Sequence, residues 1–196
     1  NLPYQAAKPL KEELGIRKGV RIKIKKRIPV AAGLGGGSSN AATVLLGLNR
    51  FWNLRLSKEK LLSLAAKLGS DVPFFILETS FAFGQGRGEV LKDVKAGRIK
   101  IWHCVVKPPF SISTKDAYAA LNAPLRRESR RLTPKNPNVK MLLHSICRGH
   151  KAFLSKLLIN SLEVALSKRV VIILKIKREL VDLGALGALM SGSGSS

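Results

Sequence analysis

Residues 28–43 read IPVAAGLGGGSSNAAT, which places four glycines, two serines and an asparagine within a short stretch of chain. Three of the glycines are consecutive, at positions 35, 36 and 37. Glycine repeats cost backbone entropy and provide no side chain for packing. They are expected where the backbone must adopt a positive φ, or where another group must approach the main chain closely.

The sequences on either side of this stretch have different periodicities. Residues 20–30 (VRIKIKKRIPV) alternate apolar and basic side chains, which predicts a half-buried β-strand. After Ser39, apolar residues recur at the spacing of one helix face: Ala42, Leu45, Leu46, Leu48 and Trp52. The glycines are therefore predicted to connect a strand to the N-terminus of a helix.

A helix N-terminus preceded by glycines is suited to binding an anion. Its first N–H groups lack partners inside the helix, and the helix dipole places partial positive charge there. Residues 35–38 would offer a row of amides with little side chain in the way, and we interpret the loop as a site for a nucleotide polyphosphate. The alternative is a flexible linker. No GKS or GKT closes a Walker motif, and the GxGxxG pattern with a following acidic residue is absent.

The remaining segments predict an alternation of helices and strands, with a domain boundary near residue 97. For residues 170–183 both a strand at the start and a helix throughout are considered. The other predicted elements are helices at 5–14, with Pro9 near the first turn, at 57–68, with Ser57 as N-cap, from 113 or 114, and at 141–158; a hairpin at 81–94; strands at 99–110 and 185–190; and a loop or short exposed helix at 126–140.

Composition narrows the classes of function. The 196 residues carry a formal net charge of +23, which attracts nucleic acid, anionic membranes or phosphorylated small molecules. Two distant cysteines and three scattered histidines predict neither a disulfide framework nor a metal site. No apolar run approaches the roughly 18 residues that cross a bilayer. We expect a cytoplasmic protein, or a stromal one if the source is a plant plastid.

Several polar residues have two interpretations each. Asp71, in GSDVPFF, is either a helix cap or a carboxylate that orients and deprotonates a substrate hydroxyl. Ser38 and Ser39 cap the helix, contact phosphate or Mg²⁺, or do both. Thr114 is an N-cap or a substrate contact, and the closing GSGSS is a second anion-binding loop or a frayed end. Asn160 and Glu163, in NSLE, are expected to bond backbone groups rather than to catalyse.

Six segments in this order resemble the GHMP kinases: IPVAAGLGGGSSNAA, GSDVPFF, GQGRGE, KPPFSISTKDAY, NSLE and MSGSGSS. Within that family they are most similar to the members that phosphorylate a hydroxyl of diphosphocytidyl-methylerythritol in the non-mevalonate isoprenoid pathway. The resemblance implies an α+β fold with two domains. Residues 1–97 would form an ATP-binding domain similar to domain 2 of ribosomal protein S5, and residues 98–196 a ferredoxin-like domain.

The resemblance also implies roles for individual residues. Asp71 would be the catalytic aspartate, and Thr114 and Gly192 would contact the substrate. ATP, with Mg²⁺, would be the phosphate donor to a small-molecule acceptor, with no membrane or nucleic-acid partner; the oligomeric state is left open. The ATP phosphates would be wrapped by Pro29, Val30, Ala31, Ala32, Gly33, Leu34, Gly35, Gly36, Gly37, Ser38 and Ser39.

One departure from the family pattern affects the expected activity. The family begins with a strand that carries a catalytic lysine followed by an asparagine, and no such segment precedes Asn1. We therefore expect an internal piece of a longer protein that lacks its first strands, folds poorly by itself and has almost no activity. Three alternatives stay open: a homoserine or mevalonate-type GHMP kinase, a basic nucleic-acid-binding module, and a nucleotide-binding relic without catalysis.

Overall fold

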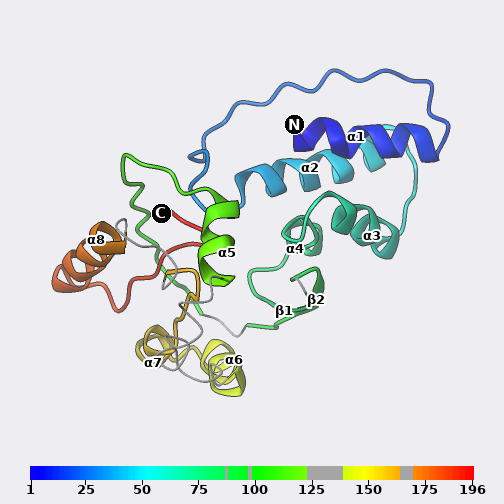
Figure 1. Ribbon diagram of the computed structural model, residues 1–196. Helices are drawn as coiled ribbons and strands as arrows, with labels where there is room; N and C mark the ends of the chain where they lie inside the picture. Colours follow the sequence, from blue (N-terminus) through cyan, green and yellow to red (C-terminus); the bar gives the residue numbers. More distant parts are fainter. Residues whose placement is uncertain (87, 97–98, 123–138, 164–169) are drawn as a thin grey trace. The chain divides into compact units, whose positions relative to one another are not determined.

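The computed structural model describes residues 1–86, 88–96, 99–122, 139–163 and 170–196, and it divides into two compact units (Figure 1). The first unit comprises residues 1–27 and 35–95, and the second comprises residues 28–34 and 96–196. The first contains α1 (Leu2–Glu13), α2 (Gly36–Phe51), α3 (Lys58–Leu68), α4 (Val72–Leu77), β1 (Ala82–Gln85) and β2 (Val90–Asp93). The second contains α5 (Thr114–Asn122), α6 (Val139–Arg148), α7 (Lys151–Lys156) and α8 (Val170–Asp182).

The four helices of the first unit enclose one apolar core. The stripe predicted for the helix after the glycines is confirmed in most positions, since α2 buries Ala42, Leu45 and Leu48. Its C-cap residue, Trp52, is also buried, and Leu46 is partly buried. Helix α1 lies alongside α2 in Figure 1 and contributes the fully buried Leu10. Large-to-small changes at such core positions typically cost about 2–5 kcal/mol. Helix α1 starts at Leu2, so Pro3 occupies its first turn and the placement of Pro9 there was wrong.

The ends of α3 follow the predicted capping pattern. Ser57 has an extended backbone, and its hydroxyl accepts a hydrogen bond from the Lys60 N–H at 3.3 Å. Gly69 ends the helix, as predicted. Lys60 and Lys67 of α3 donate to the Glu13 carboxylate at the end of α1, at 3.1 and 3.2 Å. These charged donors hold the pKa of Glu13 below its usual value.

The glycine-turn hairpin is confirmed. Strands β1 and β2 pair antiparallel, with Ala82 opposite Asp93 and Gln85 opposite Val90. Gly86 and Gly88 have φ values of +68° and +102°, which side chains rarely adopt, so the GQGRGE sequence fits a tight connection. Arg87 lies outside the described residues.

The strand predicted at residues 20–30 was wrong. Residues 17–35, all of which the structure describes, belong to no helix or strand. Val20 and Ile22 are 38% and 37% exposed. A β-strand exists only when a neighbouring strand satisfies its N–H and C=O groups, and the described residues provide no such neighbour here.

The second unit also corrects several predictions. Residues 99–110 and 185–190, all of which the structure describes, belong to no strand, so both predicted strands were wrong. The helix predicted at 141–158 is two helices, α6 and α7, because Gly149 takes a φ of +72° between them. Residues 170–182 are helical throughout, as α8. The segment predicted as a loop or short exposed helix, 126–140, lies outside the described residues up to residue 138. Its last two residues are the first two of α6.

A small apolar cluster organises the second unit. Its buried members come from distant segments and include Ile112, Ala117 of α5, Ile173 of α8 and Met190. Met190 therefore anchors the closing segment of the chain in this apolar cluster.

The helices and the one hairpin of the described residues agree with the predicted α+β class. None of the described helices is long and apolar enough to traverse a bilayer.

Candidate functional site

The glycine stretch opens helix α2, as predicted. Gly35 has left-handed dihedrals, φ 64° and ψ 13°, and the helix starts at Gly36. The first N–H with a helical partner is that of Ser39, which donates to the Gly35 carbonyl at 2.8 Å. Among the described residues, nothing accepts a hydrogen bond from the N–H groups of Gly36, Gly37 and Ser38. Three backbone donors at the positive end of the dipole are thus free to bind an anion.

Apolar side chains border this row of amides. A Cβ on Gly35 would lie 2.8 Å from Cζ of Phe75, so the aromatic ring packs directly against the glycine backbone. In the first turn of α2, a Cβ on Gly37 would meet Leu2 Cδ1 at 3.3 Å. Phe75 belongs to α4 and makes an edge-to-face contact with Phe74, with ring centroids 5.3 Å apart. The packing holds Phe75 of α4 against the N-cap residue of α2.

Asp71 immediately precedes α4. It occupies the N-cap position with φ −87° and ψ −14°, but its side chain makes no capping hydrogen bond to the helix. The capping interpretation of Asp71 is therefore wrong. The side chain is exposed, so its carboxylate is accessible to a ligand.

In the second unit, residues 28–34 pack against the closing segment of the chain. The Ser191 hydroxyl donates to the Gly33 carbonyl at 2.9 Å, and the Ser196 N–H donates to the Ala32 carbonyl at 3.3 Å. Gly194 fits between Met190 and Ile112, where an added Cβ would be 2.7 Å from Met190 Sδ. The frayed-end interpretation of GSGSS is therefore wrong.

Gly33→Ala is expected to destabilise the second unit strongly. Gly33 has φ +74°, and an added Cβ would be 1.9 Å from the Ser191 carbonyl oxygen, a distance that the backbone can relieve only by moving. We expect a loss of at least about 2 kcal/mol in unfolding free energy. Gly184→Ala is the matched control, because Gly184 also has positive φ but open space around it. Equal losses in urea denaturation of the two variants would contradict this packing.

The two residues assigned to the substrate lie in this same cluster. Ser113 caps α5, since its hydroxyl accepts a hydrogen bond from the Asp116 N–H at 3.4 Å. The N-cap interpretation of Thr114 was therefore wrong, because Thr114 is the first residue of the helix. The Thr114 hydroxyl instead lies 2.9 Å from that of Ser193. Gly192 contacts Gly33, with a Cβ-to-carbonyl distance of 3.2 Å if a Cβ is added. The second unit thus brings Thr114, Gly192 and Gly33 into one network.

Comparison with known proteins identifies the family. Residues 1–79 match the family described as "GHMP kinases N terminal domain". The 4-diphosphocytidyl-2-C-methyl-D-erythritol kinase of Alkaliphilus metalliredigens is 42% identical over 99% of this chain and 64% of the relative. The chain belongs to the GHMP kinases. The enzyme of the same name from Geobacillus kaustophilus is 43% identical over 99% of this GHMP kinase chain and 63% of the relative, so the chain spans less than two thirds of these relatives.

Solved structures agree on the GHMP kinase fold. A crystal structure of 4-(cytidine 5'-diphospho)-2C-methyl-D-erythritol kinase matches with a TM-score of 0.74 and 34% identity, over 100% of this chain and 66% of that one. Homoserine kinase from Cytophaga hutchinsonii matches with a TM-score of 0.70 over 99% of this chain and 64% of that one, at 20% identity, which supports the fold alone.

Two contacts of this GHMP kinase chain were not foreseen in the sequence. Phe75 belongs to the GSDVPFF segment, and nothing in VPFF indicates which ring packs on Gly35. Ser191 was one of several serines near the end of the chain, and only the structure shows that its hydroxyl reaches Gly33. Groups of three or more His, Cys, Asp or Glu with metal-binding potential do not occur among the described residues.

Proposed function

We propose that the natural protein carrying this chain transfers the γ-phosphate of ATP to a hydroxyl of 4-diphosphocytidyl-2-C-methyl-D-erythritol, in the non-mevalonate route to isoprenoid precursors. The observation that carries the proposal is the 42% identity, over 99% of the chain, to a kinase named for that acceptor. The relatives cited are bacterial, which supports a location in the cytoplasm.

The glycine stretch is proposed to bind the phosphates of ATP, through Pro29–Ser39. The free N–H groups of Gly36, Gly37 and Ser38 support this role, because phosphoryl transfer needs preorganised positive potential around the moving charge. Mg²⁺, when bound, would neutralise charge on the phosphate oxygens. Ser38 and Ser39 provide the hydroxyl type that suits a hard cation, although Ser39 already donates to the Gly36 carbonyl at 3.1 Å.

Asp71 is proposed to accept the proton of the acceptor hydroxyl or to orient that hydroxyl for in-line attack. Two features support the assignment: the carboxylate has no capping bond to occupy it, and Phe75 of the helix that follows Asp71 packs on Gly35, next to the amide row. Thr114 and Gly192 are proposed as substrate contacts.

The protein is proposed to have two domains. Residues 1–97 would form the ATP-binding domain, similar to domain 2 of ribosomal protein S5, and residues 98–196 the ferredoxin-like domain. The division of the compact units between Lys95 and Ala96 supports a boundary at this point.

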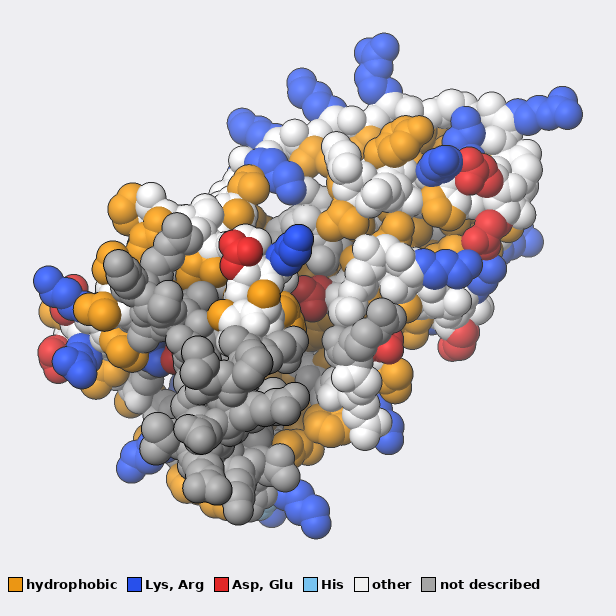
Figure 2. All heavy atoms as spheres, in the orientation of Figure 1, with side chains coloured by type: hydrophobic (Ala, Val, Ile, Leu, Met, Phe, Trp, Pro, Cys, Tyr) orange, Lys and Arg blue, Asp and Glu red, His pale blue; other side chains and the backbone are white. Residues whose placement is uncertain are grey.

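A nucleic-acid-binding role is less well supported than a kinase role. Figure 2 shows Lys and Arg side chains projecting at intervals from both units on the face drawn. On this face, the described Lys and Arg side chains do not gather into the single basic surface that nucleic-acid-binding domains use. We therefore propose a small-molecule acceptor as the partner of this protein.

An acceptor screen tests the proposed function. The full-length natural protein would be assayed with ATP and Mg²⁺ against diphosphocytidyl-methylerythritol, homoserine and mevalonate. We expect kcat/KM for the first acceptor to exceed the other two by about 100-fold or more, because a site built for a polar group rejects molecules that lack it. A preference for homoserine or mevalonate would refute the acceptor assignment. Salt-dependent RNA binding that ignores ATP, without phosphorylation, would refute the kinase proposal altogether.

A further inference from the structure

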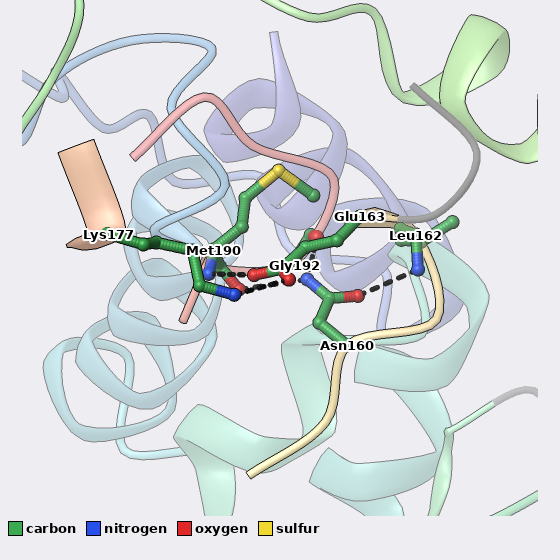
Figure 3. A network of polar contacts seen from close by, with 6 residues as sticks. All are labelled: Asn160, Leu162, Glu163, Lys177, Met190 and Gly192. Atoms are coloured by element: carbon green, nitrogen blue, oxygen red, sulfur yellow. Dashed lines mark hydrogen bonds and ion pairs between the residues drawn. The ribbon is translucent and has the colours of Figure 1, made fainter. Parts of the chain in front are cut away.

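Asn160 uses its side-chain amide to hold the closing loop of the chain (Figure 3). Its Nδ2 group donates to the carbonyls of Met190, at 2.8 Å, and Gly192, at 2.7 Å. Its Oδ1 atom accepts the Leu162 N–H at 2.9 Å, which fixes the direction of the amide. Both N–H bonds of the amide are therefore directed at the two carbonyls that flank Ser191.

Glu163 holds the same loop through a backbone N–H group, whereas Asn160 holds it through two carbonyls. Its Oε1 atom accepts the Met190 N–H at 2.6 Å, and its Oε2 atom pairs with Lys177 Nζ of α8, also at 2.6 Å (Figure 3). The Glu163 and Lys177 side chains are only 16% and 23% exposed. Since partial burial weakens solvent screening, this pair constrains Glu163 more than an exposed pair would.

The restrained loop contacts the glycine stretch directly. Ser191 lies between the two carbonyls held by Asn160, and its hydroxyl bonds the Gly33 carbonyl at 2.9 Å. The Cβ position on Gly33 overlaps the Ser191 carbonyl, so the two backbones touch without intervening side chains. A shift of Met190–Gly192 would therefore be transmitted to Gly33.

We propose that Asn160 and Glu163 are positioning residues, which hold Ser191 and Gly192 against Gly33 so that residues 29–34 of the proposed ATP-binding stretch keep their phosphate-binding conformation. The inference rests on the proposed function of that stretch. The geometric requirement is strict, because displacing a binding group by about 1 Å can cost about 100-fold in rate. Loops that form such sites need a surrounding shell of hydrogen bonds to stay within that tolerance.

Direct ATP titration of full-length protein tests the proposal. Asn160→Asp keeps the acceptor for Leu162 but replaces the NH₂ donors with a carboxylate oxygen facing two carbonyls. Glu163→Ala removes the acceptor for Met190, whereas Glu163→Gln retains an acceptor oxygen and loses the charge. We expect Asn160→Asp and Glu163→Ala to raise the Kd for ATP about tenfold, and Glu163→Gln to remain within about threefold.

Lys175→Met controls for the loss of a charged pair that does not involve Glu163. Lys175 lies on the same helix as Lys177 and forms only an exposed pair with Glu179 at 3.9 Å. It should leave the Kd unchanged. Wild-type affinity in Asn160→Asp, or a loss that merely tracks the unfolded fraction in near-ultraviolet circular dichroism, would overturn the proposal. If Asn160→Asp does not fold, the comparison of Glu163→Ala with Glu163→Gln decides, and equal Kd values overturn it. Absence of ATP binding by the wild-type protein would instead refute the proposed function.

Discussion

Replacing Asp71 with Asn in the full-length protein is expected to lower kcat by about 100-fold or more while leaving the Kd for ATP within about threefold. The substitution keeps the size of the side chain and removes its ability to accept a proton. Asp71 makes no capping hydrogen bond to α4 and is exposed, so the change should not disturb the fold. The proton-transfer contribution would be lost and the phosphate-binding amides would be retained.

The measurement combines steady-state kinetics with ATP titration. Asp93→Asn is the matched control, because Asp93 is another exposed carboxylate of the first unit and lies on the β1–β2 hairpin. It changes the net charge by the same amount and should leave kcat unaltered. A wild-type kcat in Asp71→Asn would exclude the proposed role. Parallel losses of kcat and ATP affinity would indicate instead that Asp71 supports the nucleotide site.

The helices of the first unit were predictable because their signals are local. The spacing of Leu45, Leu48 and Trp52 marks one face of a helix, and that face is buried in the structure. Ser57 and Gly69 likewise act on neighbouring residues as caps. Helical hydrogen bonds close within four residues, so a short window of sequence contains most of what decides them.

The strand at 20–30 was not predictable by the same reasoning, because a strand depends on a partner. Alternation in the sequence did identify the apolar face correctly. Val20, Ile22 and Ile24 line a groove of about 670 Å³ together with residues of α1, including Ala7. Alternation indicates which side of an extended segment is apolar, but the partner that completes the hydrogen-bond ladder is not encoded in the segment itself.

The start of α8 illustrates a second limit. Val170–Leu174 is rich in β-branched residues, which favours a strand, whereas the wider spacing of Ile173, Ile176 and Leu180 favours a helix. The structure is helical, and Ile173 is buried while Val171 is 69% exposed. The longer periodicity prevailed over local propensity, because packing of Ile173 in the core selects one face.

The candidate site was predictable in its backbone and not in its supporting contacts. Consecutive glycines before an apolar helix predicted an amide row at residues 35–38, and the structure has three free N–H groups there, at Gly36, Gly37 and Ser38. The bond between Ser191 and Gly33 joins residues 158 positions apart, and such long-range contacts leave no periodic signal in one sequence. Asn160 was expected to bond backbone groups, and that expectation is confirmed, but its target carbonyls required the structure.

Gly36→Val is expected to weaken ATP binding to the full-length protein by about 100-fold or more, since two or more charge-assisted hydrogen bonds would be lost. Gly36 is the first residue of α2, and its N–H is one of the three free donors. A branched side chain there would occupy the space in which a phosphate approaches the amides. Valine is no worse than glycine as a helix residue, so intrinsic helix propensity does not predict a loss of stability.

Gly47→Val provides the matched control for that measurement. Gly47 lies in the same helix, it is exposed, and a Cβ added there meets no atom within 4 Å. The two variants make the same chemical change in the same helix, one at the amide row and one away from it. Isothermal titration with ATP should therefore show a large loss only for Gly36→Val. If both variants bound ATP like the wild type, the free amides of α2 would not be the phosphate site, and the assignment of Pro29–Ser39 to ATP would fail with them.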